Sequence, residues 1–377
     1  MEVSLVRCED YSREPLLKAI RQGLEPLGGI GRFVKPGERI LLKPNLLSAK
    51  PAHRAVTTHP NIVWAMIKLV EEAGGIPLVG DSPGLGSTLK VAKACGVMDV
   101  VGQTSAELLQ IKNAVKVDNP RGRRFKRFEV AEELLTVDGV INLPKLKTHA
   151  QMLLTMGVKN IFGCVPGKRK AQWHLQAGTD LEYFSQMMLD LHDYIKPRLT
   201  VMDAIISMEG NGPSSGDPVR TGFVAISPSA LALDTVCASI VGKDVLQVPI
   251  LKTAHTQGLE DVRQEKIGIL GEKPERFKPH KFSFPPLINV DFAYFLPSPL
   301  KRVVKSALTS RPVIEHRRCT LCGVCVDVCP PKIMRKEDRI HIDYDGCIRC
   351  YCCQEVCPEE AIEAKQGWLK RLLSGSS

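Results

Sequence analysis

The cysteines near the C-terminus carry the clearest chemistry in this sequence of 377 residues. Nine of the thirteen cysteines lie between positions 319 and 357, and eight of these form two copies of the spacing C-x₂-C-x₂-C-x₃-C-P. This doubled run is the ligand pattern for a pair of 4Fe–4S clusters. Zinc ribbons and disulfide scaffolds are the alternatives, but zinc sites favour two separated CxxC knuckles over two complete runs ending in Pro. We therefore predict two 4Fe–4S clusters as cofactors, and an electron-conducting role for this part of the chain.

The spacing also suggests which cysteines share a cluster. Three close thiolates can hold three corners of a cubane, but their tight loop does not readily reach the fourth. In two-cluster ferredoxins the last cysteine of each run binds the other cluster. We therefore assign Cys319, Cys322, Cys325 and Cys357 to the first cluster, and Cys329, Cys347, Cys350 and Cys353 to the second. Cys352 is spare, and is either a bystander or a residue that replaces Cys353 or tunes the cluster.

Polar side chains follow four segments of the first 275 residues that are predicted to be strands. These are Lys43 and Asn45, then Asp81 and Ser82, then Lys145, Lys147 and His149, and finally Asp203. Ligands of open α/β sheets bind outside the carboxyl ends of the strands, so we expect these side chains at one rim. Lysine and histidine side chains suit carboxylate or phosphate groups. The pattern predicts a small anionic substrate, or a further small-molecule cofactor, bound by Lys43, Asn45, Ser82, Lys145, Lys147 and Asp203.

Proton transfer at this rim is assigned to His149 or Asp81. His59, His149 and His174 could also supply a metal site, although capping of a helix is the alternative for His59. The glycine-rich loop 80–88 could hold an anion at a helix start, but its spacing matches neither nucleotide-binding motif. Cys164 is either reactive or, like most isolated cysteines, a small buried hydrophobe.

The elements that position these residues alternate between strand and helix. An apolar strand at 38–42 is followed by a helix that begins at Thr58-His59-Pro60 and stops at Gly74-Gly75. A second strand at 76–79 completes a βαβ unit, which implies a parallel sheet. Further strands are predicted at 139–143, 199–202 and 223–226, with a helix near 180–195.

These elements predict a three-layer α/β domain with a mostly parallel sheet, followed by a small α+β dicluster ferredoxin domain. The expected boundaries are 1–278 for the α/β domain, 279–312 for a connector, 313–364 for the ferredoxin domain and 365–377 for a basic tail.

Composition narrows the class of protein. Hydrophobic residues make up 44% of the chain and charged residues 24%, which is typical of a soluble globular protein. We find no export signal and no run of 18 apolar residues, and therefore expect no membrane span. Reduced thiolates and clusters indicate the cytoplasm.

Charge indicates the kind of partner. The formal net charge of +10 falls to about +6 when two clusters, each of about −2, are counted. Basic residues flank the first cysteine run or lie inside the second, and they either favour an acidic redox partner protein or only offset cluster charge. They are Arg317, Arg318, Lys332, Arg335, Lys336 and Arg349. The basic run at 121–127 fits a solvated hairpin, and without stacking aromatics we expect no nucleic acid.

Seven stretches of the large domain point to a known family. In chain order they are LLKPNLL, TTHP, GDSPG, INLPKLKTH, GVKNIFG, EGNGP and LALDTV. They resemble the domain-of-unknown-function family 362, whose members are often fused to a C-terminal dicluster ferredoxin, as here. The resemblance covers essentially the whole chain. It implies an iron–sulfur redox protein of anaerobic or facultative metabolism, and it implies no particular reaction for the large domain.

Together these features predict an iron–sulfur protein that passes single electrons to or from a small anion bound in the α/β domain. Fusion of the two domains gives the electron donor a high effective concentration at its acceptor. An enzyme of this kind would be an iron–sulfur oxidoreductase. One alternative is a ferredoxin-type carrier whose large domain docks partner proteins. Another is a maturation factor that holds a metal or cofactor precursor.

Overall fold

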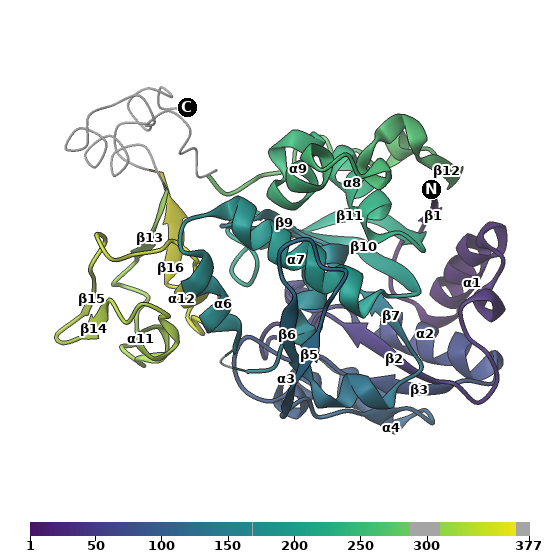
Figure 1. The fold of residues 1–377 in the computed structure, drawn as a ribbon, viewed down its shortest axis with the longest axis horizontal. Coiled ribbons are helices and arrows are strands. Elements are labelled where there is room, and N and C mark those ends of the chain that lie inside the picture. The colour runs from purple at the N-terminus through teal and green to yellow at the C-terminus, as the bar shows by residue number, and fades with distance from the viewer. Residues whose placement is uncertain (168, 287–309, 367–377) are drawn as a thin grey trace.

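A mixed sheet runs through the large domain in the computed structural model, which describes residues 1–167, 169–286 and 310–366 (Figure 1). Its strands lie in the order β12 (Gly268–Gly271), β1 (Glu2–Arg7), β11 (Asp217–Ser227), β10 (Leu199–Glu209), β7 (Gly139–Leu143), β2 (Arg39–Pro44), β3 (Ile76–Val79) and β4 (Glu107–Leu108). Neighbouring strands from β10 to β4 are parallel, whereas β11 is antiparallel to both β1 and β10. The predicted mostly parallel sheet is confirmed.

One segment differs from the sequence-based prediction. No strand was predicted after 139–143, but Lys145–His149 form a further strand, β8, which pairs with β10 and with β9 (Leu153–Thr155). All five residues of β8 are buried. Their polar side chains therefore need partners inside the protein rather than water.

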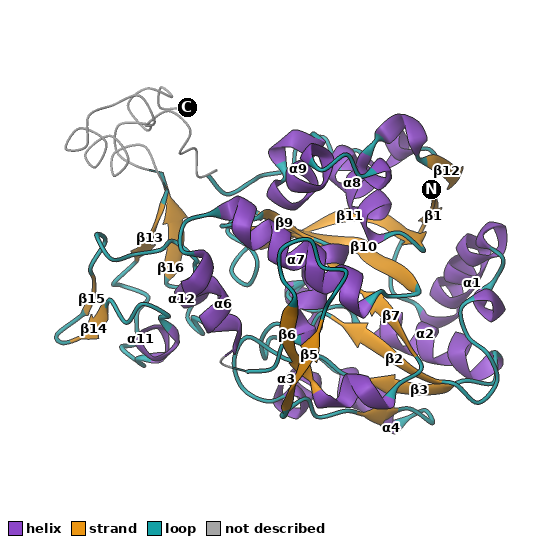
Figure 2. Ribbon diagram, viewed as in Figure 1, coloured by secondary structure: helices purple, strands orange, loops and turns teal. Residues whose placement is uncertain are grey.

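Helices cover both faces of the sheet, which gives the predicted three layers (Figure 2). Alternation along β11 shows the two faces, because Phe223 packs in one core and its neighbour Val224 in the other. The Val224 core includes α1 (Arg13–Leu24), α2 (Pro60–Glu72), α3 (Thr88–Ala94) and α4 (Val97–Gly102). The Phe223 core includes α5 (Gly157–Asn160), α6 (Arg169–Ala177), α7 (Leu181–Ile195), α8 (Ala230–Ile240) and α9 (Pro249–Thr256).

His59 forms the N-terminal cap of α2. Its Nδ1 accepts a hydrogen bond from the backbone N–H of Asn61 at 3.2 Å, and Pro60 occupies the first helical position. Its ring stacks on Tyr11 with 3.6 Å between ring centroids. These contacts agree with the alternative in which His59 caps a helix.

The basic run at 121–127 joins two strands, β5 (Ala114–Asp118) and β6 (Arg127–Ala131), which pair antiparallel as a hairpin. The Asp190 carboxylate of α7 accepts hydrogen bonds from the backbone N–H groups of Arg123 and Phe125 at 2.9 and 2.7 Å. The loop is thus held onto the α/β domain by its backbone. Short 3₁₀ helices span Glu25–Leu27, Ile30–Arg32, Ala52–Arg54, Glu132–Thr136, Ile161–Cys164, Val245–Gln247, Glu260–Val262, Gln264–Lys266 and Pro274–Phe277.

The small domain contains two short antiparallel strand pairs and two short helices. They are β13 (Arg311–Ile314) with β16 (Ile362–Lys365), β14 (Met334–Lys336) with β15 (Ile340–Ile342), α11 (Val324–Val328) and α12 (Cys352–Glu355). Polar contacts fix it against the large domain. The Gln354 amide donates to the carbonyl oxygen of Asn211 at 2.6 Å, and Arg54 pairs with Glu360 at 2.9 Å. The docking segment at Asn211 belongs to the EGNGP stretch.

The described part of the expected connector contacts the α/β domain. Phe282 and Phe284, which lie inside the predicted connector, pack against the core of the α/β domain. Positions 287–309 of the connector and 367–377 of the basic tail lie outside the described residues. Within the described residues, no helix has the length and apolar character required to span a membrane.

Candidate functional site

The eight cysteines of the two runs gather in two groups, each around its own small cavity. One cavity is lined by Cys319, Cys322, Cys325 and Cys357. The other is lined by Cys329, Cys347, Cys350 and Cys353. Each group therefore combines three cysteines of one run with the last cysteine of the other, which is the arrangement the crossed assignment predicts. Four thiol groups around one cavity are the donor set that a 4Fe–4S cluster requires, so these residues fit the cofactor.

The remaining cysteines lie outside both groups. Cys8, Cys95, Cys164 and Cys237 are buried in the α/β domain. Burial raises the pKa of Cys164 to about 12, which keeps its thiol protonated and unreactive. Cys352 lines neither cysteine cavity and faces a larger one.

This larger cavity lies between the two domains and has a volume of about 920 Å³. From the α/β domain it is lined by residues after β2 and β3 and by residues of β8, α5 and α6. From the ferredoxin domain it is lined by residues that include Cys329, Pro330, Cys352 and Glu355. Cys329 and Pro330 also line the second cysteine cavity, so they form the wall between the two spaces. We call this space the interdomain cavity; its volume is that of a small-molecule site.

Three lysines that are not exposed line the interdomain cavity without an ion-pair partner among the described residues. Lys147 donates from Nζ to Asn45 Oδ1 at 2.9 Å and to the carbonyl oxygen of Val56 at 2.5 Å. Burial lowers the pKa of Lys147 to about 7. Lys159 of α5 forms no hydrogen bond with the described residues, and burial lowers its pKa as well. These ammonium groups have lost water without forming an ion-pair contact.

The third lysine, Lys170, belongs to α6. Its Nζ donates to the backbone carbonyl oxygens of Ser82 and Pro83, the latter at 3.1 Å. Burial lowers the pKa of Lys170 to about 8. The Ser82 hydroxyl in turn accepts a hydrogen bond from the backbone N–H of Gly167 at 3.2 Å. The loop after β3 therefore holds Lys170 at the cavity wall.

A histidine and a glutamate meet across the domain boundary. His149 Nδ1 accepts hydrogen bonds from the backbone N–H groups of Gln151 and Met152, at 3.1 and 3.2 Å. These donors place the imidazole proton on Nε2, which lies 3.0 Å from Glu355 Oε1 of the ferredoxin domain. Burial lowers the pKa of His149 to about 4, so the ring is neutral at pH 7.

His174 is the second histidine at the cavity. It is buried, its ring stacks on Phe184 with 4.5 Å between centroids, and its Nδ1 has no partner among the described residues. Burial lowers the pKa of His174 to about 3, so this ring is also neutral. Neither histidine adds positive charge to the cavity.

Local sequence explains how Lys159 is held. The GVKN segment forms α5. The buried Asp234 carboxylate of α8 accepts hydrogen bonds from the backbone N–H groups of Gly157 and Val158 at 2.6 and 2.9 Å. A Cβ atom on Gly157 would lie 2.9 Å from Asp234 Oδ1, so the close approach requires glycine. Asp234 thus anchors the turn that carries Lys159 and Asn160.

Comparison with known proteins identifies the families of the two domains. The model of the family described as Domain of unknown function (DUF362) matches residues 40–239, which is more than half of the chain. The chain belongs to the DUF362 family. A 4Fe-4S dicluster domain matches residues 311–358, which makes this DUF362 protein an iron–sulfur protein with 4Fe–4S cofactors.

Two named proteins are similar to this DUF362 chain to different degrees. It is 40% identical over 303 residues to the thylakoid-associated protein sll1697 of Synechocystis, a match that spans 78% of this chain and 94% of that protein. The lactate racemase apoprotein of Thermoanaerobacterium thermosaccharolyticum aligns with a TM-score of 0.45 and 13% identity. That alignment spans 63% of this chain and 57% of the racemase chain.

The predicted anion-binding and proton-transfer residues of the DUF362 domain fall into two sets, those that line the interdomain cavity and those that do not. Asn45, Ser82, Lys147, His149 and Asp81 line the interdomain cavity. Lys43, Lys145 and Asp203 do not line it, so the expectation of one shared pocket is corrected for them. The reason is that each of the two lysines pairs with a buried carboxylate.

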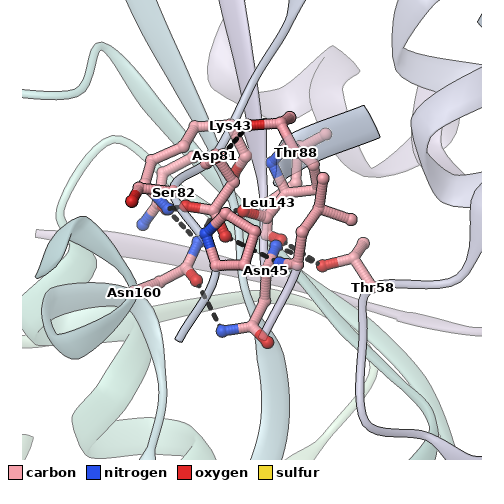
Figure 3. Close-up of polar contacts among 12 residues, drawn as sticks. Lys43, Asn45, Thr58, Asp81, Ser82, Thr88, Leu143 and Asn160 are labelled. Atoms are coloured by element: carbon pink, nitrogen blue, oxygen red, sulfur yellow. Dashed lines mark hydrogen bonds and ion pairs between the residues drawn. The ribbon is translucent and has the colours of Figure 1, made fainter. Parts of the chain in front are cut away.

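The two buried ion pairs account for these side chains. Lys43 Nζ lies 2.7 Å from Asp81 Oδ1 (Figure 3). Asp81 Oδ2 accepts a hydrogen bond from the backbone N–H of Leu46 at 2.7 Å. Lys145 Nζ lies 2.9 Å from Asp203 Oδ2, which also accepts from the backbone N–H of His59. Both carboxylates are therefore occupied by protein donors, and Asp81 is poorly suited to the proton transfer predicted for it.

Sequence reasoning missed Lys159, Lys170 and Glu355. Lys159 lies in the GVKNIFG stretch, so the motif gave a signal that was not used. Glu355 lies between two predicted cluster ligands, and only its contact with His149 reveals that it faces the other domain. Lys170 is in a helix with no motif.

Proposed function

We propose that this protein is an oxidoreductase-type iron–sulfur protein that exchanges single electrons with an anionic small molecule bound in the interdomain cavity. The 4Fe–4S clusters supply the single-electron chemistry. The observation that carries the proposal is the shared wall: Cys329 and Pro330 line both the interdomain cavity and the second cysteine cavity. A bound molecule would thus lie next to a cluster ligand.

The residues of the cavity divide into binding and proton-handling groups. Lys147, Lys159 and Lys170 supply charge-assisted donors to the anion. His149 holds a proton at Nε2 beside Glu355, so this pair can exchange a proton with a bound molecule as its charge changes. His149 therefore keeps its proposed proton-transfer role, whereas the role proposed for Asp81 passes to Glu355.

Exposed charge supports a separate docking point for a protein partner. Cys322 of the first cysteine group is exposed, and so are Arg317, Arg318 and Lys336 nearby in the sequence. Such a surface suits an acidic redox partner that exchanges electrons at the first cluster. Cytoplasmic location and a place in anaerobic metabolism remain proposals, because the Synechocystis relative is named for an association with thylakoids.

The first test removes one cavity charge. Lys147→Met keeps the apolar stem and should weaken binding of phenyl phosphate to the anaerobic holoprotein about tenfold or more, since a charge-assisted hydrogen bond contributes roughly 1.5–3 kcal/mol. Binding is measured by calorimetry, and the phosphate-bound protein should show a shifted midpoint potential for one cluster. Lys252→Met, on the exposed side of α9, is the control and should bind normally.

A loss of iron without a loss of anion binding would favour the ferredoxin-type carrier. If Lys147→Met loses iron while phenyl phosphate affinity is unchanged, or if no small anion binds the intact protein, the large domain is better described as a docking body.

Anion affinity should also depend on pH. The pKa of Lys147 is lowered to about 7 and that of Lys170 to about 8, so both ammonium groups lose their charge as the pH rises through this range. The facing histidines are neutral throughout, because their pKa values are about 4 and 3. A carboxylate probe, with an ordinary pKa of about 4, keeps its charge. Its affinity should therefore be at least about tenfold weaker at pH 9 than at pH 6.5, and Lys147→Met should flatten the profile. A profile that rises with pH would contradict this.

A further inference from the structure

We propose that the natural ligand of the interdomain cavity is an organic dianion, either a dicarboxylate or a phosphate monoester, that carries an apolar body. This inference rests on the proposed function, because it concerns the same cavity. It follows from three features of the cavity: its charge balance, the position of the lysines relative to the cysteine groups, and its apolar lining.

At pH 6.5, where the three lysines that line the cavity wall are mostly protonated, the charge balance leaves two positive charges without a partner. Three ammonium groups, those of Lys147, Lys159 and Lys170, line the cavity. Two buried or half-buried carboxylates face them, but Asp81 is already neutralised by Lys43, which lies outside the lining. Glu355 is left as the one carboxylate that the three lysines share, and its charge raises the pKa of each of them.

Groups at the open rim do not change this balance. Lys112, Asp327 and Lys332 line the cavity but are exposed, so water screens their charges. The neutral histidines add no charge. Buried charges are stable when they are paired, and a ligand with two negative charges would pair the two remaining ammonium groups.

The clusters are the competing source of negative charge. If the lysines served only to offset cluster charge, they should lie beside the cysteine groups. Among the described residues, however, no lysine or arginine lines either cysteine cavity. Lys147 instead donates to Asn45 and Val56, and Lys170 to Ser82 and Pro83, on the α/β side of the interdomain cavity. Lys159 lines the same cavity from α5 of the α/β domain. All three lysines face the space where a ligand would bind.

The rest of the lining is suited to an apolar body. The apolar residues come from both domains and include Leu47, Ile111, Phe162, Leu175, Val328 and Val356. Phe162 lies next to the charged end, with its ring centroid 6.0 Å from Lys159 Nζ. A volume of about 920 Å³ exceeds what a bare inorganic anion would fill. An anionic group attached to a hydrocarbon or aromatic body matches both the lysines and the apolar lining of the cavity.

The test compares two probes that differ by one carboxylate, phenylsuccinate and hydrocinnamate. Calorimetry on the anaerobic holoprotein at pH 6.5 should show that phenylsuccinate binds at least about tenfold more tightly. Phenyl phosphate, as a third probe, decides between dicarboxylates and phosphate monoesters. In Lys159→Met and, separately, in Lys170→Met, phenylsuccinate and hydrocinnamate should bind with nearly equal affinity. Lys252→Met is the matched control and should retain the preference. Iron content and circular dichroism verify that each variant is folded and loaded.

The outcomes separate this inference from the function on which it rests. If phenylsuccinate and hydrocinnamate bind equally well and both shift a cluster potential, the ligand is a monoanion, and only the dianion inference is wrong. If no probe binds, the proposed function itself fails. If Lys159→Met and Lys170→Met shift the cluster potentials and leave the probe preference unchanged, the lysines offset cluster charge, and the dianion inference is overturned.

Discussion

Replacing Cys357 by Ala should remove the iron of the first cluster and leave the second intact. The intact chain should carry about eight iron atoms after anaerobic purification, and the variant about four. Cys357 belongs to the second run in the sequence, but it lines a cavity with Cys319, Cys322 and Cys325 of the first run. Its sulfur also accepts a hydrogen bond from the backbone N–H of Ala361 at 3.3 Å, which fixes its position.

Iron counts of double variants identify which cluster is lost. Cys319→Ala combined with Cys357→Ala should retain about four iron atoms, because both changes affect the same cluster. Cys347→Ala combined with Cys357→Ala should retain almost none, because the two changes affect different clusters. An uncrossed arrangement predicts the reverse for the two double variants, so the comparison decides between them.

Cys352→Ala is the control for these measurements. Cys352 neighbours Cys353 but faces the interdomain cavity, so its removal should leave the iron content unchanged. A loss of iron in this variant would show that Cys352 serves as a ligand and would require a new assignment for the second cluster.

The clusters were predictable because their information is local. Four cysteines and a proline within a dozen positions restrict the chemistry whatever surrounds them. Similarly, the strand–helix–strand pattern from 38 to 79 identified a parallel sheet, because hydrophobic periodicity reflects burial. The antiparallel placement of β11 between β1 and β10 was not predictable, since it depends on how distant segments pair.

The site was less predictable, because sequence spacing does not reveal which charges are already paired. Lys145 and Lys147 are two positions apart on β8, yet Lys145 pairs with Asp203 while Lys147 lines the interdomain cavity. Likewise, nothing in the cysteine runs indicates that Glu355 contacts His149 of the other domain. Such roles depend on tertiary contacts. The rule that ligands bind at the carboxyl ends of the strands places these side chains at one rim, but it does not show which of them are already paired.

The Lys43–Asp81 pair gives the second large effect. Asp81→Asn should destabilise the α/β domain by about 3–5 kcal/mol, because it leaves the Lys43 ammonium buried without a counter-charge. The Lys43 side chain is 1% exposed and the Asp81 side chain 4%, so water cannot replace the lost partner. Thermal unfolding followed by circular dichroism should show a midpoint lower by roughly 2–4 °C for each kcal/mol.

A second variant disturbs the Lys43–Asp81 pair by a steric clash. A Cβ atom on Gly163 would lie 1.8 Å from Asp81 Oδ1 and 2.7 Å from Lys43 Nζ, so Gly163→Ala should force the two side chains apart and lower the unfolding midpoint similarly. Gly102→Ala is the control, because no atom lies within 4 Å of the added Cβ. Lys43→Met added to Asp81→Asn should recover part of the loss, since it removes the unpaired charge.

These variants also decide what Asp81 does. A structural ion pair predicts that Asp81→Asn lowers stability and that Lys43→Met offsets part of this. A residue that serves only proton transfer predicts nearly normal stability. Because both oxygens of Asp81 already accept hydrogen bonds from Lys43 and Leu46, we expect the first result. The proton-handling role at this cavity then belongs to His149 and Glu355, whose contact joins the two domains.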